Sequence, residues 1–254
     1  MCLVVFAWNP HAGRRLALVG NRDEFHARAA APMGWWREPA LLAGRDLVAG
    51  GTWLGVDAAG RFGVLTNFRG APNPPSPPSR GTLIPRFLAG DASPSAFLAE
   101  IARSGREYAG FSLLVGDATE LAYLSNADAS GPQRLEPGVY GLSNGLLDSP
   151  WPKVTASRAR LEAHLSRGSG SPEELLDLLG DRNEAPDEGL PDTGIPRELE
   201  RRLSAPFIVG EGYGTRATSV LLLDGGGRGT ALERTHGSDG RATGLRRFTI
   251  GSGA

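Results

Sequence analysis

The order of strand-like and helix-like segments along the chain is the feature that most restricts its fold. Short continuous apolar runs at residues 3–8 and 15–20, with turn residues between them, indicate a buried hairpin near the N-terminus. Later segments follow in blocks of strands, helices, strands, helices and strands. Because no helix alternates with each strand, this order predicts an α+β fold with antiparallel sheets.

Local patterns predict the individual elements. Apolar runs bounded by glycine or other turn residues predict strands at residues 52–57, 62–66, 111–115, 120–125, 138–142, 206–209, 215–224 and 229–235. Helical spacing, or serine and proline at a helix start, predicts helices at residues 82–88, 93–103, 152–166 and 171–180. Irregular, proline-rich or acidic composition predicts loops at residues 25–45, 72–78 and 181–196.

The length of 254 residues can be accommodated by one large core, so we expect a single domain over residues 1–254. The net charge of -1, with 22% charged residues, gives no reason to expect nucleic acid or an acidic membrane as a partner. No apolar segment approaches the ~20 residues that a membrane-spanning helix needs. The first apolar run is too short for a signal peptide, so we expect a cytoplasmic protein of undetermined oligomeric state.

The only cysteine of the chain is Cys2, so no intrachain disulfide can form. If the initiator methionine is removed, Cys2 carries both a thiol and a free α-amine. With ordinary pKa values of ~8.5 for the thiol and ~7.7 to 8.0 for the amine, the amine can accept the thiol proton near neutral pH. It can later protonate a leaving amine. Alternatively, Cys2 is a small apolar residue on a buried strand, and its position alone leaves both interpretations open.

The run Asn21-Arg22-Asp23-Glu24 is expected at a sheet edge, because it directly follows the second apolar strand. An arginine beside the thiol would favour the thiolate, and an aspartate would hold or orient the α-amine. Adjacent residues on a strand point to opposite faces, so Arg22 and Asp23 can serve one site only if the chain turns there. Otherwise they form a surface ion pair worth ~0 to 1 kcal/mol.

Three further polar residues, Asn67, Asn144 and Arg216, emerge from apolar strands. An asparagine amide at a strand end can donate a hydrogen bond to a developing oxyanion, and losing such a donor can slow catalysis ~100- to 1000-fold. The alternative is turn chemistry, because asparagine favours turns on its own account.

A competing motif is Gly141-Leu142-Ser143-Asn144-Gly145, which matches the nucleophile elbow of serine hydrolases, with His236 later in the chain. That motif requires a helix directly after the serine. Pro150 and Pro152 follow closely and favour a loop, which argues against a serine hydrolase.

The other ionisable residues give weaker indications. The histidines, at positions 11, 26, 164 and 236, show no paired spacing and no metal site is expected from them. His26 is close enough to the acidic run to be a pocket residue or an axial haem ligand. Lys153 is the only lysine, so any Schiff-base lysine would have to be this residue.

A set of ordered motifs resembles the NRDE family, which includes the transport and Golgi organisation proteins. The residues that carry the resemblance are Met1-Cys2, Asn21-Arg22-Asp23-Glu24-Phe25, Ala43-Gly44-Arg45-Asp46, Gly50-Gly51-Thr52-Trp53-Leu54-Gly55, Leu65-Thr66-Asn67-Phe68-Arg69, Gly141-Leu142-Ser143-Asn144, Pro150-Trp151-Pro152-Lys153-Val154 and Gly214-Thr215-Arg216.

The resemblance implies a four-layer αββα sandwich of the N-terminal-nucleophile hydrolase type, with two antiparallel sheets. Within that superfamily the chain is similar to the linear-amide hydrolases, which use cysteine, arginine, aspartate and asparagine, although there the early arginine and aspartate are not adjacent. The resemblance implies these catalytic residues: Cys2, Arg22, Asp23, Asn144 and Arg216. We expect neighbouring motif residues to bind substrate: Asn21, Glu24, His26, Trp53 and Asn67.

Two functions follow as expectations. The fold resemblance implies a cysteine amidohydrolase acting on a small linear amide, with no cofactor or metal required. The family resemblance implies a non-catalytic protein that binds haem or another hydrophobic ligand, because eukaryotic members are linked to Golgi organisation and haem trafficking. Fold alone does not decide between them.

Overall fold

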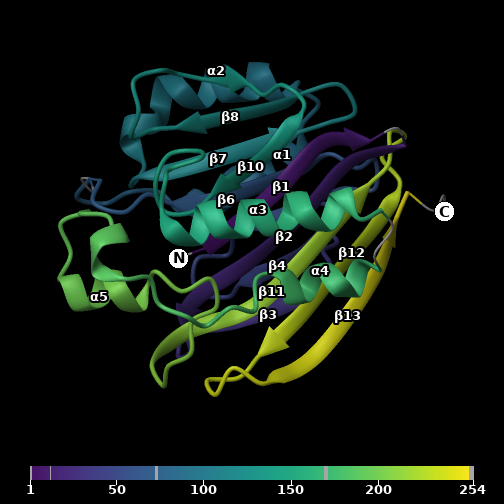
Figure 1. The fold of residues 1–254 in the computed structure, drawn as a ribbon. Helices are drawn as coiled ribbons and strands as arrows, with labels where there is room; N and C mark the ends of the chain where they lie inside the picture. The colour runs from purple at the N-terminus through teal and green to yellow at the C-terminus, as the bar shows by residue number, and fades with distance from the viewer. Residues whose placement is uncertain (1, 12, 72–73, 169–170, 252–254) are drawn as a thin grey trace.

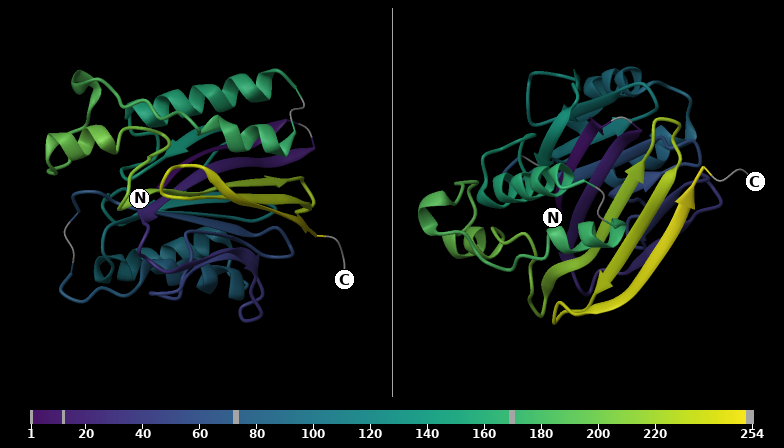
Figure 2. Two further views of the ribbon diagram at one scale, coloured as in Figure 1. Left: turned by 90° about the horizontal axis from the view of Figure 1, so that it is seen from below. Right: turned by 45° about the vertical axis from the view of Figure 1, so that its right-hand side comes forward.

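The computed structural model describes residues 2–11, 13–71, 74–168 and 171–251. Two stacked sheets lie between two layers of helices (Figures 1 and 2). The first sheet has the strand order β10 (Gly138–Leu142), β1 (Cys2–His11), β2 (Arg14–Phe25), β11 (Tyr213–Leu223), β12 (Gly229–His236) and β13 (Ala242–Ile250). The second has the order β3 (Ala30–Trp35), β4 (Leu42–Asp46), β5 (Leu54–Val56), β6 (Phe62–Asn67), β7 (Phe111–Gly116), β8 (Leu121–Ser125) and β9 (Gln133–Arg134).

Neighbouring strands in both sheets run antiparallel. The outer face of the first sheet is covered by α3 (Pro152–Ser166) and α4 (Pro172–Leu178), and that of the second by α1 (Leu83–Ala89) and α2 (Pro94–Ser104). The short α5 (Arg197–Arg202) lies at one end of the sandwich (Figure 1). Single 3-10 turns are η1 (Arg80–Thr82), η2 (Gly105–Glu107) and η3 (Asp187–Gly189). The predicted four-layer αββα sandwich is confirmed.

The first strand is apolar from Cys2 to Trp8 because both of its faces are buried over these residues. Val4 and Phe6 pack between the two sheets, whereas Leu3 and Val5 pack against α3 and α4. Alternate residues of a strand point to opposite faces, so burial on both sides requires a continuous apolar run. Cys2 has the same parity as Val4 and therefore faces the layer between the sheets.

The predicted loop over residues 25–45 is wrong, because β3 and β4 lie within it. Pro32 and two tryptophans obscured the strand pattern. Since β3 is an edge strand with a register shift between Ala31 and Gly34, Pro32 is tolerated there without the loss of a central ladder bond.

The C-terminal region also differs from the prediction. Residues 206–209 form no strand; the Ile208 N–H instead donates to the Thr215 side chain at 2.9 Å. The edge strand β13 was not predicted, because its largely exposed side chains give little apolar signal. Pro72 and Asn73 of the predicted proline-rich loop lie outside the described residues. Among the helices of the described ranges, none is long and apolar enough to cross a bilayer.

Candidate active site

Strand register brings Cys2 and Arg22 together. Cys2 pairs directly with Arg22 across β1 and β2, and Arg22 pairs with Ala217 of β11. Directly opposed residues share a face of the sheet, so the thiol and the guanidinium both point between the sheets. Burial raises the pKa of the Cys2 thiol, the Asp23 carboxylate adds to this rise, and Arg22 opposes it.

A cavity of about 810 Å³ opens beside the thiol, between the two sheets. This volume is in the range of small-molecule sites. Its wall includes seven of the residues predicted for catalysis or binding, namely Cys2, Arg22, Asp23, Glu24, Trp53, Asn67 and Arg216.

The cavity wall is rich in arginine. Five arginines line it, namely Arg22, Arg28, Arg45, Arg80 and Arg216. Arg28 pairs with Asp46 at 2.8 Å, whereas the Arg80 guanidinium donates to a backbone carbonyl and that of Arg45 stacks over a tryptophan ring. Within the described part of the chain, Arg45 and Arg80 have no carboxylate partner within salt-bridge distance. The cavity therefore offers guanidinium groups to an anionic ligand.

A bulge in β11 directs Arg216 towards the cavity. Thr215 pairs with Asp23 and Ala217 pairs with Arg22, so Arg216 is the extra residue between them. A bulge re-aims the side chain that it leaves out of the ladder. The Arg216 guanidinium donates to the Phe25 carbonyl at 3.3 Å and to that of Arg28, which fixes it beside the end of β2.

Asp23 lies behind Arg22 because β2 continues to Phe25 and does not turn at the motif. The whole motif lies inside the strand, and the expectation that it follows the strand end is wrong. The Asp23 carboxylate accepts a 2.7 Å hydrogen bond from Thr215, and the residue is 1% exposed. Burial raises the pKa of Asp23, while the Lys153 ammonium lowers it. Asp23 still influences Cys2, because its backbone N–H lies close enough to lower the pKa of the thiol.

Lys153 was missed as a site residue. It lies in the first turn of α3 and is 3% exposed, and its Nζ donates to the Leu203 carbonyl at 2.8 Å. Burial lowers its pKa to about 8. The signal available in the sequence was its status as the only lysine, within one of the motifs that carry the family resemblance.

The end of β10 is tied to the start of β1 and to the end of β6. Ser143 Oγ donates to the Cys2 carbonyl at 3.0 Å, and Asn144 Nδ2 donates to the Asn67 carbonyl at 2.9 Å. Asn144 is buried and lies outside the cavity wall, and one of its amide hydrogens is already donated to the Asn67 carbonyl. The oxyanion roles of Asn67 and Asn144 stay predictions. Ser143 is followed by turns as far as Pro150, so the expectation that no elbow helix follows it is confirmed.

The remaining predicted residues divide between the cavity and the protein interior. Trp53 lines the cavity and packs on Gly20, where a Cβ would lie 3.0 Å from the indole, so a side chain there would displace the ring. Asn21 is fully buried behind β2, and His26 lies beside the Gly210 carbonyl at 3.0 Å; neither borders the cavity. No cluster of three potential metal ligands occurs in the ranges that the structure describes.

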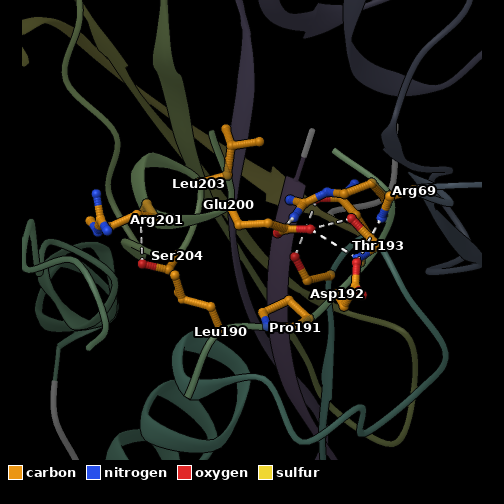
Figure 3. Close-up of polar contacts among 12 residues, drawn as sticks. Arg69, Leu190, Pro191, Asp192, Thr193, Glu200, Arg201, Leu203 and Ser204 are labelled. Carbon is orange, nitrogen blue, oxygen red and sulfur yellow. Dashed lines mark hydrogen bonds and ion pairs between the residues drawn. The ribbon is translucent and has the colours of Figure 1, made fainter. Parts of the chain in front are cut away.

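The rear of the site is the side of β1 and β2 that faces away from the cavity. It is covered by residues 190–204, which we call the strap. Glu200, 2% exposed, pairs with the buried Arg69 and accepts hydrogen bonds from the backbone and hydroxyl of Thr193 (Figure 3). Arg69 in turn stacks over the Trp151 ring at 5.1 Å. Together with the bond from Lys153 to Leu203, these contacts fix the strap behind β1 and β2.

Comparison with known proteins gives consistent matches. The family model described as Transport and Golgi organisation 2 matches residues 1–238. The Transport and Golgi organization 2 homolog of Mus musculus is 30% identical over 92% of this chain and 93% of its own. The Transport and Golgi organization protein 2 of Drosophila melanogaster is also 30% identical, over 92% of this chain and 92% of its own.

Solved structures match at the level of fold. The Caenorhabditis elegans ortholog of N-acylethanolamine-hydrolyzing acid amidase has a TM-score of 0.51 and 9% identity, covering 89% of this chain and 93% of that one. The C2A mutant of conjugated bile acid hydrolase from Clostridium perfringens has a TM-score of 0.47 and 9% identity, covering 100% and 94%. The fold is that of the N-terminal-nucleophile hydrolases.

Proposed function

Because the chain belongs to the Transport and Golgi organisation 2 family and has an N-terminal-nucleophile hydrolase fold, we propose that it is a cysteine amidohydrolase acting on a small linear amide. The observation that carries the proposal is the Cys2 thiol at the wall of a cavity of about 810 Å³, with Arg22 directly opposite on the next strand. A cytoplasmic location is part of the proposal, on the grounds of the single cysteine.

The proposed reaction begins once Met1 has been removed. The α-amine of Cys2 takes the thiol proton, and the thiolate forms a bond to the amide carbonyl carbon. The resulting oxyanion is stabilised by hydrogen-bond donors, for which Asn67 and Asn144 are the candidates. Collapse breaks the C–N bond, and the α-ammonium protonates the leaving amine. Water then hydrolyses the thioester and releases the acid.

The cavity wall supports a substrate that combines an apolar part with an acidic group. Trp53 and Leu65 offer apolar surface. Of the five arginines, Arg45 and Arg80 have no carboxylate partner within salt-bridge distance among the described residues, so their guanidinium groups can bind a carboxylate or a similar anion. An N-acyl amino acid has both features and a linear amide between them.

The proposal is tested with a panel of N-acyl amino acids of increasing acyl length. Intact-mass spectrometry is expected to show a chain without Met1 and, after rapid quenching, an acyl adduct on Cys2. Release of the free amino acid is expected to fall at least ~1000-fold in Cys2→Ala, since the nucleophile is absent. A mature chain that retains Met1 rejects this mechanism, because the α-amine is then not on Cys2.

The second candidate is a carrier of haem or another amphipathic anion, favoured by arginines and Trp53 in one cavity. His26, the axial ligand expected from the sequence, does not border the cavity, so Cys2 is the alternative ligand to test. Haem is titrated into the wild type and Cys2→Ala while the Soret band is followed. Absence of a saturable shift at micromolar haem rejects the haem carrier; saturable binding without acyl adducts favours it over the amidase.

A further inference from the structure

The only lysine of the chain occupies a position that is unfavourable for a cation. The chain has 27 lysines and arginines in total, and arginine fills every position except 153. Lys153 is 3% exposed and lies in the first turn of α3. A buried charge loses hydration, and a cation at a helix N-terminus opposes the helix dipole. Such a position calls for a compensating partner.

The fold places this ammonium at the catalytic end of β1. Leu3 and Val5 of β1 share a buried cluster with Val154, the residue after Lys153. Figure 1 shows the first turn of α3 beside the N-terminal end of the chain. Val154 also contacts β10 so closely that a Cβ on Gly141 would lie 2.6 Å from its side chain. The start of α3 therefore lies directly behind the strands that carry the candidate nucleophile.

The ionisable groups that act electrostatically on Lys153 come from four other elements or segments. They are Asp23 of β2, Arg69 after β6, Cys2 of β1 and Glu200 of α5. Glu200 pairs with Arg69, which leaves Asp23 as the main opposite charge for Lys153. Asp23 is held by the Thr215 hydroxyl at 2.7 Å on the same rear side of the strand.

We propose that Lys153 is a positioning residue for the nucleophile: its ammonium keeps the Asp23 carboxylate ionised, and that carboxylate holds the α-ammonium of Cys2. This inference rests on the proposed function, since it requires a free α-amine on Cys2. Without Lys153, a carboxylate buried as deeply as Asp23 takes up a proton. The α-amine then loses its proton more readily, and the thiolate loses a neighbouring positive charge. This loss outweighs the removal of the Asp23 charge, because the N-terminal ammonium lowers the pKa of the thiol more than the Asp23 carboxylate raises it. Cys2 is therefore less nucleophilic without Lys153.

A structural role alone is the competing explanation, because Lys153 also donates to the Leu203 carbonyl in the strap. That role predicts lower stability without a change in thiol ionisation. The two explanations are separated by measuring thiol ionisation directly, with no need for a substrate.

The test is the pH dependence of Cys2 alkylation by iodoacetamide, in which the thiolate displaces iodide. In Lys153→Met the pH midpoint of Cys2 alkylation is expected to rise by about one pH unit. At pH values below the midpoint, alkylation is then about tenfold slower than in the wild type. Lys153→Arg keeps the charge and is expected to restore most of the reactivity. Ser204→Ala removes the strap hydroxyl that contacts Ala185 and Arg201 without changing any charge, and is expected to leave the midpoint unchanged.

A double-mutant cycle with Asp23→Asn tests whether Lys153 acts on Cys2 through Asp23. It also provides a variant to measure if Lys153→Met alone fails to fold. In the Asp23→Asn background, Lys153→Met is expected to shift the midpoint much less. An unchanged midpoint in folded Lys153→Met, or an equal shift in both backgrounds, overturns the inference. A Lys153-dependent midpoint without acyl adducts rejects only the proposed function, whereas an active enzyme with a Lys153-independent midpoint rejects only this inference.

Discussion

The two sides of β2 differ sharply at the end that carries Arg22 and Asp23, although these two residues are adjacent. On the front, the Arg22 side chain is 15% exposed and faces the cavity. On the rear, Asp23 is 1% exposed and lies in the layer covered by α3 and the strap. The front therefore presents charges to a ligand, and the rear uses its charges within the protein.

The two sides therefore contribute differently to stability and to ligand binding. Buried polar groups that lose a partner cost free energy of unfolding, because no water replaces the lost hydrogen bond. Charged groups that face an open cavity remain hydrated and cost little when they are removed. Rear substitutions should lower stability, whereas front substitutions should weaken ligand binding while the fold is retained.

The largest effect is expected for Glu200→Gln on the rear. This substitution removes one charge from the buried pair with Arg69, and breaking such a pair costs roughly 3 to 5 kcal/mol. Urea unfolding measures the change. The matched control is Asp187→Asn, which breaks the exposed pair with Arg201 at 2.7 Å and is expected to leave stability unchanged. Equal effects at the two sites would show that the buried pair does not hold the strap.

An intermediate effect is expected for Asn21→Ala, also on the rear. The amide Nδ2 donates to the Leu179 carbonyl at 3.1 Å and to the Pro206 carbonyl at 2.9 Å, while Oδ1 accepts from Thr218. Leaving these buried groups without partners should cost about 2 kcal/mol in urea unfolding.

The control for Asn21→Ala is Asn67→Ala, because Asn67 borders the cavity and Asn144 uses only its backbone carbonyl. It is expected to change stability by less than about 1 kcal/mol. A larger cost for Asn67→Ala than for Asn21→Ala would contradict the division between front and rear.

Much of the sandwich could be predicted because its strands are buried on both faces. Continuous apolar runs such as residues 3–8 identify such strands without any knowledge of their partners. The edge strands β3 and β13 could not be predicted, because one contains Pro32 and the other exposes most of its side chains. Each pairs only with the strand next to it in sequence, β4 or β12, so the missing signal lies in the composition of the edge strands themselves.

Some parts of the candidate site could be predicted, because they follow from sequence motifs and from the alternation of side chains along a strand. Cys2 and Arg22 meet because residues opposed in a hairpin share a face. The rear partners of Asp23 could not be predicted: Lys153 approaches from a helix 130 residues later in the chain, and only residues 190–196 of the strap lay in a segment with a predicted structure, a loop. The bulge that re-aims Arg216 depends on register with β2 and has no local sequence signal.

The smallest effect on stability, and a clear effect on binding, is expected for Arg216→Gln on the front. Its guanidinium borders the cavity and only contacts backbone carbonyls of the 25–28 turn, so the free energy of unfolding should change by less than about 0.5 kcal/mol. Affinity for an N-acyl amino acid should fall about tenfold, which corresponds to about 1.4 kcal/mol. Calorimetric titration measures this, with the carboxyl-amidated analogue as the control ligand. If both ligands weaken equally, Arg216 shapes the cavity wall and does not recognise the anion.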